Sequence, residues 1–397
     1  MVALALDGLR VLDVTQVMAG PFCCMLLADM GADVIKIEKP NGGDDSRRMG
    51  PPFINGESAA FLAMNRNKRS LVLDLKQPEG QVLFRRLAAQ ADVMVENFRP
   101  GTLEELGLGY AALSADHPEL IYCSISGFGQ TGPYRERGGF DLVAQGMSGL
   151  MSITGHLGQP PVKVGVPIAD LNAGMYAAYG VLCAYVHCLR TGQGQLVDTS
   201  LLEGGIAYTV WESAMYFATG VTPPPMGSAH RLAAPYQAFR TADGYLNLGA
   251  ANQANWEKLC RVLERPDLLE DPRFCDNPSR TIRAGELAVE LERVFASRPT
   301  AAWLAKLDAA GVPVGPLYDI PAVYADPHVQ ARAMMVEVEH PTVGRIKNIG
   351  IPVKLSETPG AIRRPAPTLG QHTDEILAEF GFSPEEIAQL RQARVVA

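Results

Sequence analysis

Residues 11–40, VLDVTQVMAGPFCCMLLADMGADVIKIEKP, decide the fold of this chain, because they form a strand–helix–strand pattern. The pattern predicts a strand over Arg10–Val14, a loop over Thr15–Gly20 and a helix over Pro21–Met30 that stops at Gly31. A second strand is predicted over Val34–Glu38. Such alternation is typical of a mostly parallel sheet with helices on both faces.

The same alternation continues to about residue 215 and predicts a doubly wound α/β domain. Further strands are expected at 70–75, 93–96, 120–125 and 193–199, and helices at 78–90, 102–106, 175–188 and 201–217. The proline run of 220–225, GVTPPP, marks a linker, because consecutive prolines favour an extended chain. Beyond it, a hairpin over 236–249 and helices at 255–263, 284–296 and 300–310 are expected. We therefore predict a large domain over 1–215, a linker over 216–225, a small α+β domain over 226–325, and a return connection and C-terminal segment over 326–397 that packs on the large domain.

Composition excludes several classes of protein. A formal charge of −8 and a pI near 5.5 argue against a nucleic-acid partner, which would require a net basic face. The seven histidines lack the spacing of metal ligands, and the seven cysteines lack zinc spacing and indicate buried, reduced thiols. The first residues do not resemble a signal peptide, and no apolar run is long enough to span a membrane. A cytoplasmic protein with no membrane and no metal is expected.

Residues 165–174, GVPIADLNAG, place one carboxylate where a predicted extended run, 163–168, gives way to an apolar helix. Dipoles at a helix N-terminus favour an ionised side chain, so Asp170 is expected to be a ready anion near pH 7 and a candidate nucleophile. Aspartate is also a favoured N-cap. Capping is the alternative to catalysis at this position.

Three further stretches have the composition of ligand-binding loops. The loop at 15–21 suits a phosphate but lacks the GxGxxG fingerprint of a dinucleotide site, which makes a dehydrogenase a weak alternative. ENFRPG at 96–101 offers an amide, an aromatic ring and a guanidinium at the expected ligand-binding edge of the sheet. SGFGQTGP at 126–133 and GGFDLVAQ at 138–145 are glycine-rich and let backbone approach a ligand, although an ordinary surface turn would use the same residues.

Six ordered segments together resemble the family III CoA transferases: VLDVTQVMAGPFCCMLLADMGADVIKIEKP, MNRNKRSLVLDLK, ADVMVENFRPGTLEELGLGY, SISGFGQTGPY, GGFDLVAQGMSG and VPIADLNAGMYAAYG. The resemblance runs from residue 7 almost to the C-terminus. It implies an interlocked homodimer in which each chain forms an open ring threaded by its partner. It also implies a Rossmann-like large domain that binds CoA.

The resemblance also implies roles for individual residues. The catalytic aspartate of the family matches Asp170, which would carry the acyl group as a mixed anhydride and then CoA as an aspartyl-CoA thioester. The substrates would be an acyl-CoA and a carboxylic acid, and no permanently bound cofactor is expected. The positions that contact CoA match Gln16, Val17, Ala19, Lys39, Leu73, Lys76, Asn97, Phe98 and Arg99.

The chain departs from the family pattern at informative positions. A histidine common in the first loop is Gln16 here, a basic residue of some members is Glu105, and the glycine-repeat lid of formyl-CoA transferase is absent. Racemases of the family pair the aspartate with a histidine in a Gly-His-Asp sequence, but this chain has Phe140 before Asp141. Phenylalanine cannot accept a proton, so transfer is favoured over racemisation or isomerisation. A non-catalytic acyl-CoA-binding protein is the third possibility.

The acyl groups are suggested by four segments that resemble the dicarboxylate branch of the family, at 226–230, 234–239, 340–344 and 369–373. Members of this branch typically use succinyl-CoA as donor, and their acceptors include hydroxymethylglutarate, glutarate and itaconate. The distal carboxylate of such a substrate requires a cationic or hydrogen-bonding partner. The candidate substrate-binding residues are Arg47, Phe140, Asp141, His230 and Arg231. The alternative interpretation of the charged residues is that they are ordinary surface charges with no role in binding.

Overall fold

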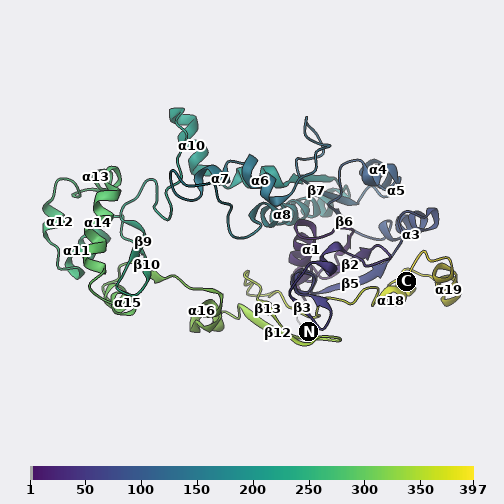
Figure 1. Cartoon of the computed structure of the whole chain (residues 1–397). Helices are drawn as coiled ribbons and strands as arrows, with labels where there is room; N and C mark the ends of the chain where they lie inside the picture. The colour runs from purple at the N-terminus through teal and green to yellow at the C-terminus, as the bar shows by residue number, and fades with distance from the viewer. Residues whose placement is uncertain (1–2) are drawn as a thin grey trace. The chain divides into compact units, whose positions relative to one another are not determined.

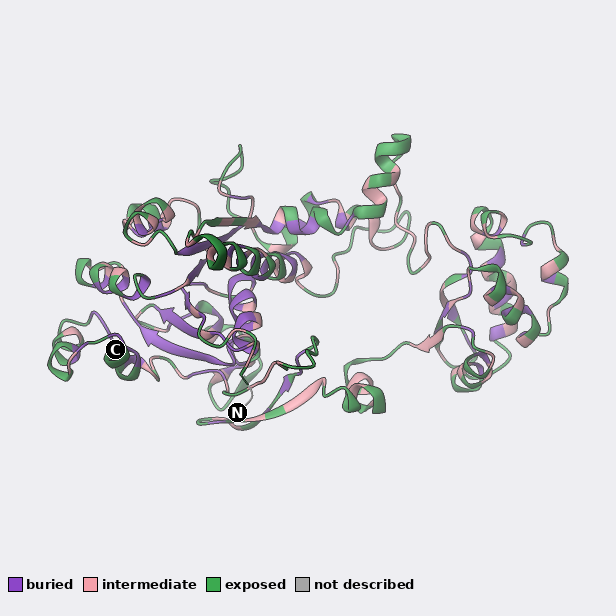
Figure 2. Cartoon of the chain, turned by 180° about the vertical axis from the view of Figure 1, so that it is seen from behind, coloured by how far each residue is buried: buried purple, intermediate pink, exposed green. Residues whose placement is uncertain are grey.

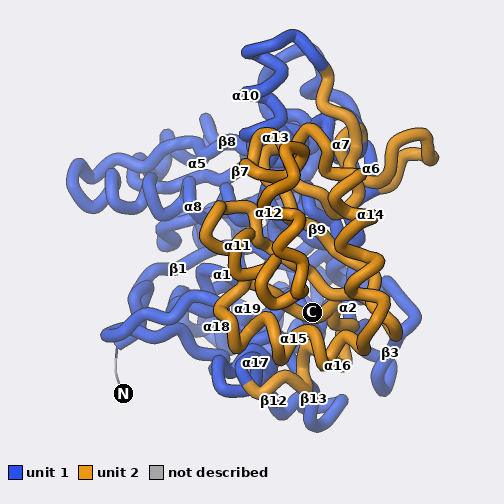
Figure 3. The backbone as a smooth tube through the Cα atoms, turned by 90° about the vertical axis from the view of Figure 1, so that its left-hand side faces the viewer, with its two compact units in different colours: residues 1–151, 163–221, 328–397 blue, residues 152–162, 222–327 orange. Residues whose placement is uncertain are grey.

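The computed structural model describes residues 3–397 (Figure 1). The chain divides into two compact units (Figure 3). Unit 1 comprises the residues up to Met151, Lys163–Val221 and His328–Ala397, and unit 2 comprises Ser152–Val162 and Thr222–Pro327.

A six-stranded parallel sheet forms the centre of unit 1, which confirms the predicted α/β class. In sheet order its strands are β5 (Lys68–Val72), β2 (Asp33–Glu38), β1 (Arg10–Asp13), β6 (Val93–Glu96), β7 (Ile121–Ser126) and β8 (Leu196–Ser200). Strands β5, β6 and β7 are buried along their whole length, as expected for a parallel sheet covered on both faces (Figure 2). In the register, Leu12 of β1 lies between Ile35 of β2 and Met94 of β6.

Helices cover both faces of this sheet. One core cluster contains side chains of α3 (Pro78–Ala88), α4 (Thr102–Glu105), α5 (Tyr110–Asp116), α18 (Thr373–Glu379) and α19 (Pro384–Gln392). The cluster on the other face contains side chains of α1 (Ala19–Asp29), α6 (Asp141–Met147), α8 (Ile168–Thr191) and α9 (Leu201–Ala207). The domain is therefore doubly wound.

The strand order reverses between β1 and β6. From β1 the chain builds outward through β2 and β5 on one side, and through β6, β7 and β8 on the other. The loops that follow β1 and β6 therefore leave the sheet on opposite faces, and the crevice between them is the usual ligand site of an open α/β sheet.

Smaller elements complete unit 1. They are the 3₁₀ turn η1 (Asp45–Arg48), the hairpin β3 (Phe53–Ile54) and β4 (Glu57–Ser58), α2 (Ala59–Met64), α10 (Val210–Thr219) and the hairpin β12 (Met335–His340) and β13 (Gly344–Ile349). The short helices α7 (Leu150–Ile153) and α17 (Pro327–Ala331) cross the unit boundaries.

Unit 2 contains a three-stranded antiparallel sheet and short helices around one core. The strands are β9 (Tyr236–Arg240), β10 (Tyr245–Gly249) and β11 (Val314–Pro316), and β9 and β10 form the predicted hairpin. The helices are α11 (Gln253–Val262), α12 (Asp267–Glu270), α13 (Asn277–Ile282), α14 (Ala284–Phe295), α15 (Thr300–Ala309) and α16 (Ile320–Ala325). The three helices predicted for this region correspond to α11, α14 and α15.

Two local predictions were wrong. No strand forms over 163–168, because this segment does not pair with another strand. Val164 N–H donates instead to the Gln145 side chain (2.9 Å). The expected helix over 201–217 breaks into α9 and α10, because the Thr209 hydroxyl donates to Ile206 O (2.8 Å) and also contacts Ser213 Oγ (2.7 Å).

The almost uncharged composition of helix α8 is typical of a buried helix, but only part of its surface is buried. Its apolar residues on one face are exposed in the single chain, although the opposite face is part of the core. The exposed residues recur at helical spacing and are Met175, Tyr179, Leu182, Val186 and Leu189. Two of the cysteines predicted to be buried, Cys183 and Cys275, are likewise exposed. Within residues 3–397, none of the helices combines the length and the apolar character needed to cross a membrane.

Candidate active site

The loop after β1 is held in an unusual conformation. Val17 has a φ of 69°, which a β-branched residue rarely adopts. Asp44 Oδ1 accepts a hydrogen bond from Val17 N–H (3.0 Å) and so stabilises this conformation. The backbone of Gln16 donates to Asn97 Oδ1 and accepts from Asn97 Nδ2, both at 2.8 Å. The loops that follow β1 and β6 are therefore joined across the point where the strand order reverses.

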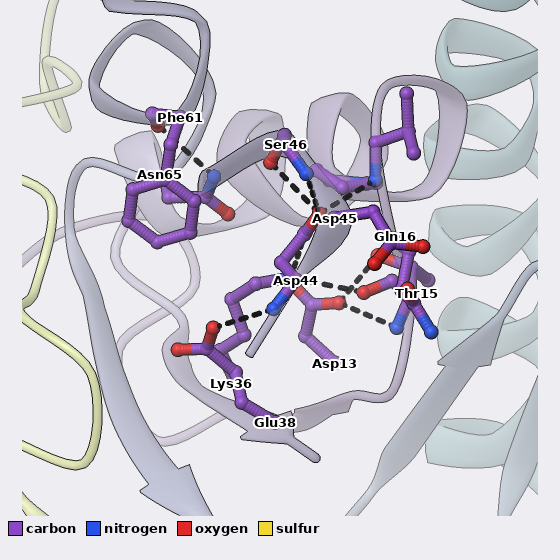
Figure 4. Close-up of polar contacts among 12 residues, drawn as sticks. Asp13, Thr15, Gln16, Lys36, Glu38, Asp44, Asp45, Ser46, Phe61 and Asn65 are labelled. Atoms are coloured by element: carbon purple, nitrogen blue, oxygen red, sulfur yellow. Dashed lines mark hydrogen bonds and ion pairs between the residues drawn. The ribbon is translucent and has the colours of Figure 1, made fainter. Parts of the chain in front are cut away.

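A buried cluster of ion pairs lies beneath this loop (Figure 4). Lys36 Nζ lies 2.9 Å from Asp44 Oδ2 and donates to Thr15 O (2.9 Å), and Lys68 Nζ lies 2.8 Å from Asp13 Oδ2. Burial disfavours ionisation of Asp44, but Lys36 and the N–H groups of the loop outweigh it and hold the pKa of Asp44 well below its usual range. The cluster thus fixes both the carboxylate and the loop that it supports.

Asp170 lies in the first turn of α8. The N-cap of this helix is Pro167, so the capping role considered for Asp170 was wrong. One turn further on, a Cβ on Gly174 would lie 2.4 Å from the carbonyl oxygen of Ala19. Only glycine therefore lets α8 pass so close to the start of α1, and this approach brings Asp170 to the loop after β1.

The pKa of Asp170 is raised from 3.8 to about 7, first by burial and then by the nearby charge of Asp141. The expectation that helix dipoles would make Asp170 a ready anion was therefore wrong.

Asp141 performs the capping at α8. Its Oδ1 accepts a hydrogen bond from Ala169 N–H (2.9 Å), and its Oδ2 accepts from Gln145 Nε2 (2.8 Å). Asp141 therefore both positions the helix turn that carries Asp170 and disfavours the ionised form of Asp170.

Replacing Asp141 with asparagine is expected to move the acid limb of the kcat/KM profile to lower pH. Asparagine still accepts from Ala169 N–H but removes the negative charge that raises the pKa of Asp170, so ionised Asp170 persists to lower pH. The measurement is the pH dependence of kcat/KM for the variant, the parent and a charge-matched control, Asp116→Asn, at an exposed site. An unchanged limb in Asp141→Asn would contradict this coupling.

Two glycine-rich loops cross beside Asp170. A Cβ on Gly139 would lie 2.5 Å from Gly127 Cα, and a Cβ on Gly127 would lie 2.7 Å from Gly139 Cα. The glycines thus allow two backbone segments to pass close to each other, whereas the close approach to a ligand stays a prediction.

Gly139→Val is expected to destabilise the protein by about 1–3 kcal/mol, because the added atoms force the two loops apart. Transfer activity should fall at least about tenfold, since loop displacement next to reacting groups is costly. Urea unfolding and steady-state rates measure both effects. Gly285→Val is the control, because no atom lies within 4 Å of a Cβ at that position. Equal behaviour of the two variants would argue against the close crossing.

Two adjoining cavities occupy the crevice. The first, which we call the Asp170 cavity, has a volume of about 420 Å³, and the second, the Lys39 cavity, has a volume of about 310 Å³. Gln16 and Phe98 line both. The Asp170 cavity also contains Val17, Ala19, Asn97, Arg99, Phe140 and Asp170, and the Lys39 cavity contains Lys39, Leu73 and Lys76. The structure thus brings together the catalytic candidate and all nine residues that the resemblance assigned to CoA.

The remaining candidates are placed differently. Arg47 binds Glu38 through two hydrogen bonds of 2.7 Å and lies over the Phe61 ring, so its guanidinium is already engaged. His230 and Arg231 belong to unit 2. Sequence reasoning missed Arg137, which lines the Asp170 cavity and could have been noticed because it directly precedes Gly138 and Gly139.

Within residues 3–397, no group of three His, Cys, Asp or Glu side chains is placed to hold a metal ion. The crevice instead contains the partly buried carboxylate of Asp170 and, along its length, the exposed cations Lys39, Lys76 and Arg99. Fold and site therefore define an α/β protein whose crevice is suited to a long anionic ligand.

Comparisons with known proteins agree with this class. The model of CoA-transferase family III matches residues 6–373, and the chain belongs to this family. The chain is accordingly a CoA-transferring enzyme.

Three similar proteins illustrate the relationship. Human succinyl-CoA:glutarate CoA-transferase is 41% identical over 392 residues, which cover 98% of this chain and 90% of that protein. Succinate–glutarate CoA-transferase of Agrobacterium fabrum is 42% identical over 386 residues, covering 94% and 95%. The crystal structure of a CAIB/BAIF family protein from Brucella suis has a TM-score of 0.85 at 39% identity and covers 96% of this chain and 100% of that one.

Proposed function

We propose that this enzyme transfers CoA from succinyl-CoA to glutarate and that Asp170 is the nucleophile. The similar human and Agrobacterium proteins are named for these two acids. The observation that carries the proposal is the position of Asp170 in a cavity shared with the residues matched to CoA binding.

In the first half-reaction, ionised Asp170 attacks the thioester carbonyl of succinyl-CoA. The C–S bond breaks, CoA leaves as the thiolate, and a mixed anhydride of succinate and Asp170 forms. The thiolate then attacks the Asp170 carbonyl, which releases succinate and leaves an aspartyl-CoA thioester. Glutarate repeats these steps in reverse order and departs as glutaryl-CoA.

Each intermediate, whether anhydride or thioester, contains an activated carbonyl, so the energy of the thioester is conserved and no ATP is required. Backbone N–H groups at the glycine loops and the start of α8 would stabilise the oxyanions by about 3 kcal/mol per donor. The burial that raises the pKa of Asp170 also restricts access of water. Restricted access protects an anhydride from hydrolysis.

The two cavities suggest how CoA would lie. The phosphates fit the Lys39 cavity, where Lys39 and Lys76 supply positive charge. The pantetheine arm would pass over Gln16 and Phe98, which line both cavities, and would bring the thioester to Asp170.

Racemisation of an acyl-CoA is the second candidate reaction. Phe140 occupies the position where racemases of the family have a histidine, and it is 78% exposed at the Asp170 cavity. Its ring cannot exchange a proton with the α-carbon. Deuterium incorporation at that carbon, measured in heavy water, is therefore expected to be absent.

We also propose the interlocked homodimer that the family resemblance implies. The apolar stripe of exposed residues along α8 supports it, because monomeric proteins rarely expose such a continuous surface. Light scattering coupled to size-exclusion chromatography measures the mass, and a monomer at micromolar concentration would contradict the dimer.

The direct test of the proposed function is incubation with succinyl-CoA and a panel of acids, followed by mass analysis of the CoA products. Glutaryl-CoA is expected to form fastest, ahead of the thioesters of hydroxymethylglutarate and itaconate. Hydroxylamine should trap the acyl-enzyme at Asp170. A parent enzyme that binds CoA but transfers nothing would favour the non-catalytic alternative.

A further inference from the structure

The Asp170 cavity contains two guanidinium groups without an acidic partner. Asp45 also lines the cavity, but Lys39 and Arg48 each bind it at 2.7 Å. Within residues 3–397, neither Arg99 nor Arg137 forms an ion pair or a side-chain hydrogen bond. The cavity therefore has positive charge beyond what its own residues neutralise.

Arg137 is held by aromatic rings. Its Cζ lies 4.5 Å from the centroid of the Tyr134 ring and 5.6 Å from that of Phe128, and these two rings meet edge to face at 5.8 Å. Arg137 N–H donates to Tyr134 O (2.9 Å), which closes the loop that carries all three residues. Contact with ring faces orients a guanidinium while leaving its N–H groups available for a carboxylate.

The proposed acyl groups each carry a second carboxylate, two or three methylene groups from the reacting carbonyl. This charge enters the cavity whenever the thioester lies at Asp170, and burying it without a partner would be strongly unfavourable. An oriented arginine is the side chain best suited to bind it through two parallel hydrogen bonds.

The two arginines occupy different positions. Arg99 directly follows Phe98, which lines both cavities, and it belongs to the segment matched to CoA binding. Arg137 lines only the Asp170 cavity and directly precedes the glycine crossing beside Asp170.

We infer that Arg137 binds the distal carboxylate of the acyl group and so selects dicarboxylates over monocarboxylates. The inference rests on the proposed function, since it names the residue that recognises the substrate of that site. Phe128 and Tyr134 are positioning residues that hold Arg137 in place.

The test compares acids of equal length with and without the second carboxylate. Glutarate and valerate serve as acceptors with succinyl-CoA as donor, and succinyl-CoA and butyryl-CoA serve as donors to glutarate. In Arg137→Gln, kcat/KM for glutarate is expected to fall about 10- to 100-fold, the typical effect of losing a hydrogen bond to a charged group. The value for valerate should change by less than about twofold, because no charged contact is lost.

Three further variants make the result specific. Arg137→Lys keeps the charge without the planar fork and should retain part of the selectivity. Arg99→Gln should raise KM for both CoA donors alike. Arg135→Gln, an exposed arginine of the same loop that does not line the cavity, should resemble the parent.

The outcomes separate the two proposals. A parent that transfers CoA from succinyl-CoA to neither acid contradicts the proposed function, and with it the inference. An active parent whose preference for glutarate over valerate is unchanged in Arg137→Gln contradicts the inference alone. An equal loss with both acids also contradicts it, because such a loss indicates general damage to the site.

Discussion

Replacing Asp170 with asparagine is expected to lower kcat/KM for CoA transfer by about 10⁴-fold or more, the scale seen when a covalent nucleophile is removed. The amide cannot form the mixed anhydride, so no acyl group leaves CoA. Asp170→Ala should show the same loss. The measurement is the initial rate of glutaryl-CoA formation, together with intact-protein mass to detect any covalent adduct.

The stability of Asp170→Asn provides the control for folding. In the folded parent the pKa of this carboxyl is about 7, above its usual value of 3.8, so the folded state disfavours ionisation. The folded state therefore loses stability as pH rises from about 4 to 7. The loss reaches at most about 4 kcal/mol, because each unit by which folding raises the pKa corresponds to about 1.4 kcal/mol. Asparagine has no charge to bury, so the variant should unfold at higher urea than the parent at pH 8 and at similar urea near pH 4. If the variant is inactive and also unstable at pH 8, misfolding would explain the loss of activity. A fully active variant would exclude Asp170 as the nucleophile.

The first half of the fold could be predicted because buried parallel strands produce continuous apolar runs. Strand β6 has the predicted bounds, Val93–Glu96, and β1 begins at the predicted Arg10. Glycine and proline mark the ends of helices with little ambiguity. These signals are local, so neighbouring residues suffice to interpret them.

The errors arose where distant residues decide the structure. The segment 163–168 was predicted to be a strand from its composition, but the side chain of Gln145 accepts the hydrogen bond from Val164 N–H that a strand partner would accept. Asp170 was predicted to precede a helix over 175–188, but α8 begins at Ile168 and includes Asp170, whose pKa depends on burial and on Asp141. Arg47 was a reasonable carboxylate ligand until the structure showed it bound to Glu38. Partners of this kind cannot be read from local sequence.

Lys36 also depends on a partner that is distant in the sequence. Among substitutions in the sheet, we expect Lys36→Met to be the most destabilising. The Lys36 side chain is fully buried and lies 2.9 Å from Asp44 Oδ2. Methionine fills similar space but leaves Asp44 without a cation, and breaking a buried ion pair in this way typically costs about 3–5 kcal/mol. The free energy of unfolding in urea measures the loss. Because Asp44 also holds Val17 in its left-handed conformation, KM for succinyl-CoA should rise as well.

A double variant shows whether the uncompensated charge is the cause. Asp44→Asn keeps an acceptor for Val17 N–H and removes the charge, so Lys36→Met combined with Asp44→Asn should be less destabilised than the sum of the two single variants. The parent should also lose the contribution of this pair as pH falls below about 4, because the folded pKa of Asp44 is depressed and its carboxylate is then progressively protonated. Lys36→Met should lack that part of the acid sensitivity. Additive effects and an unchanged acid transition would instead indicate that Lys36 contributes through packing.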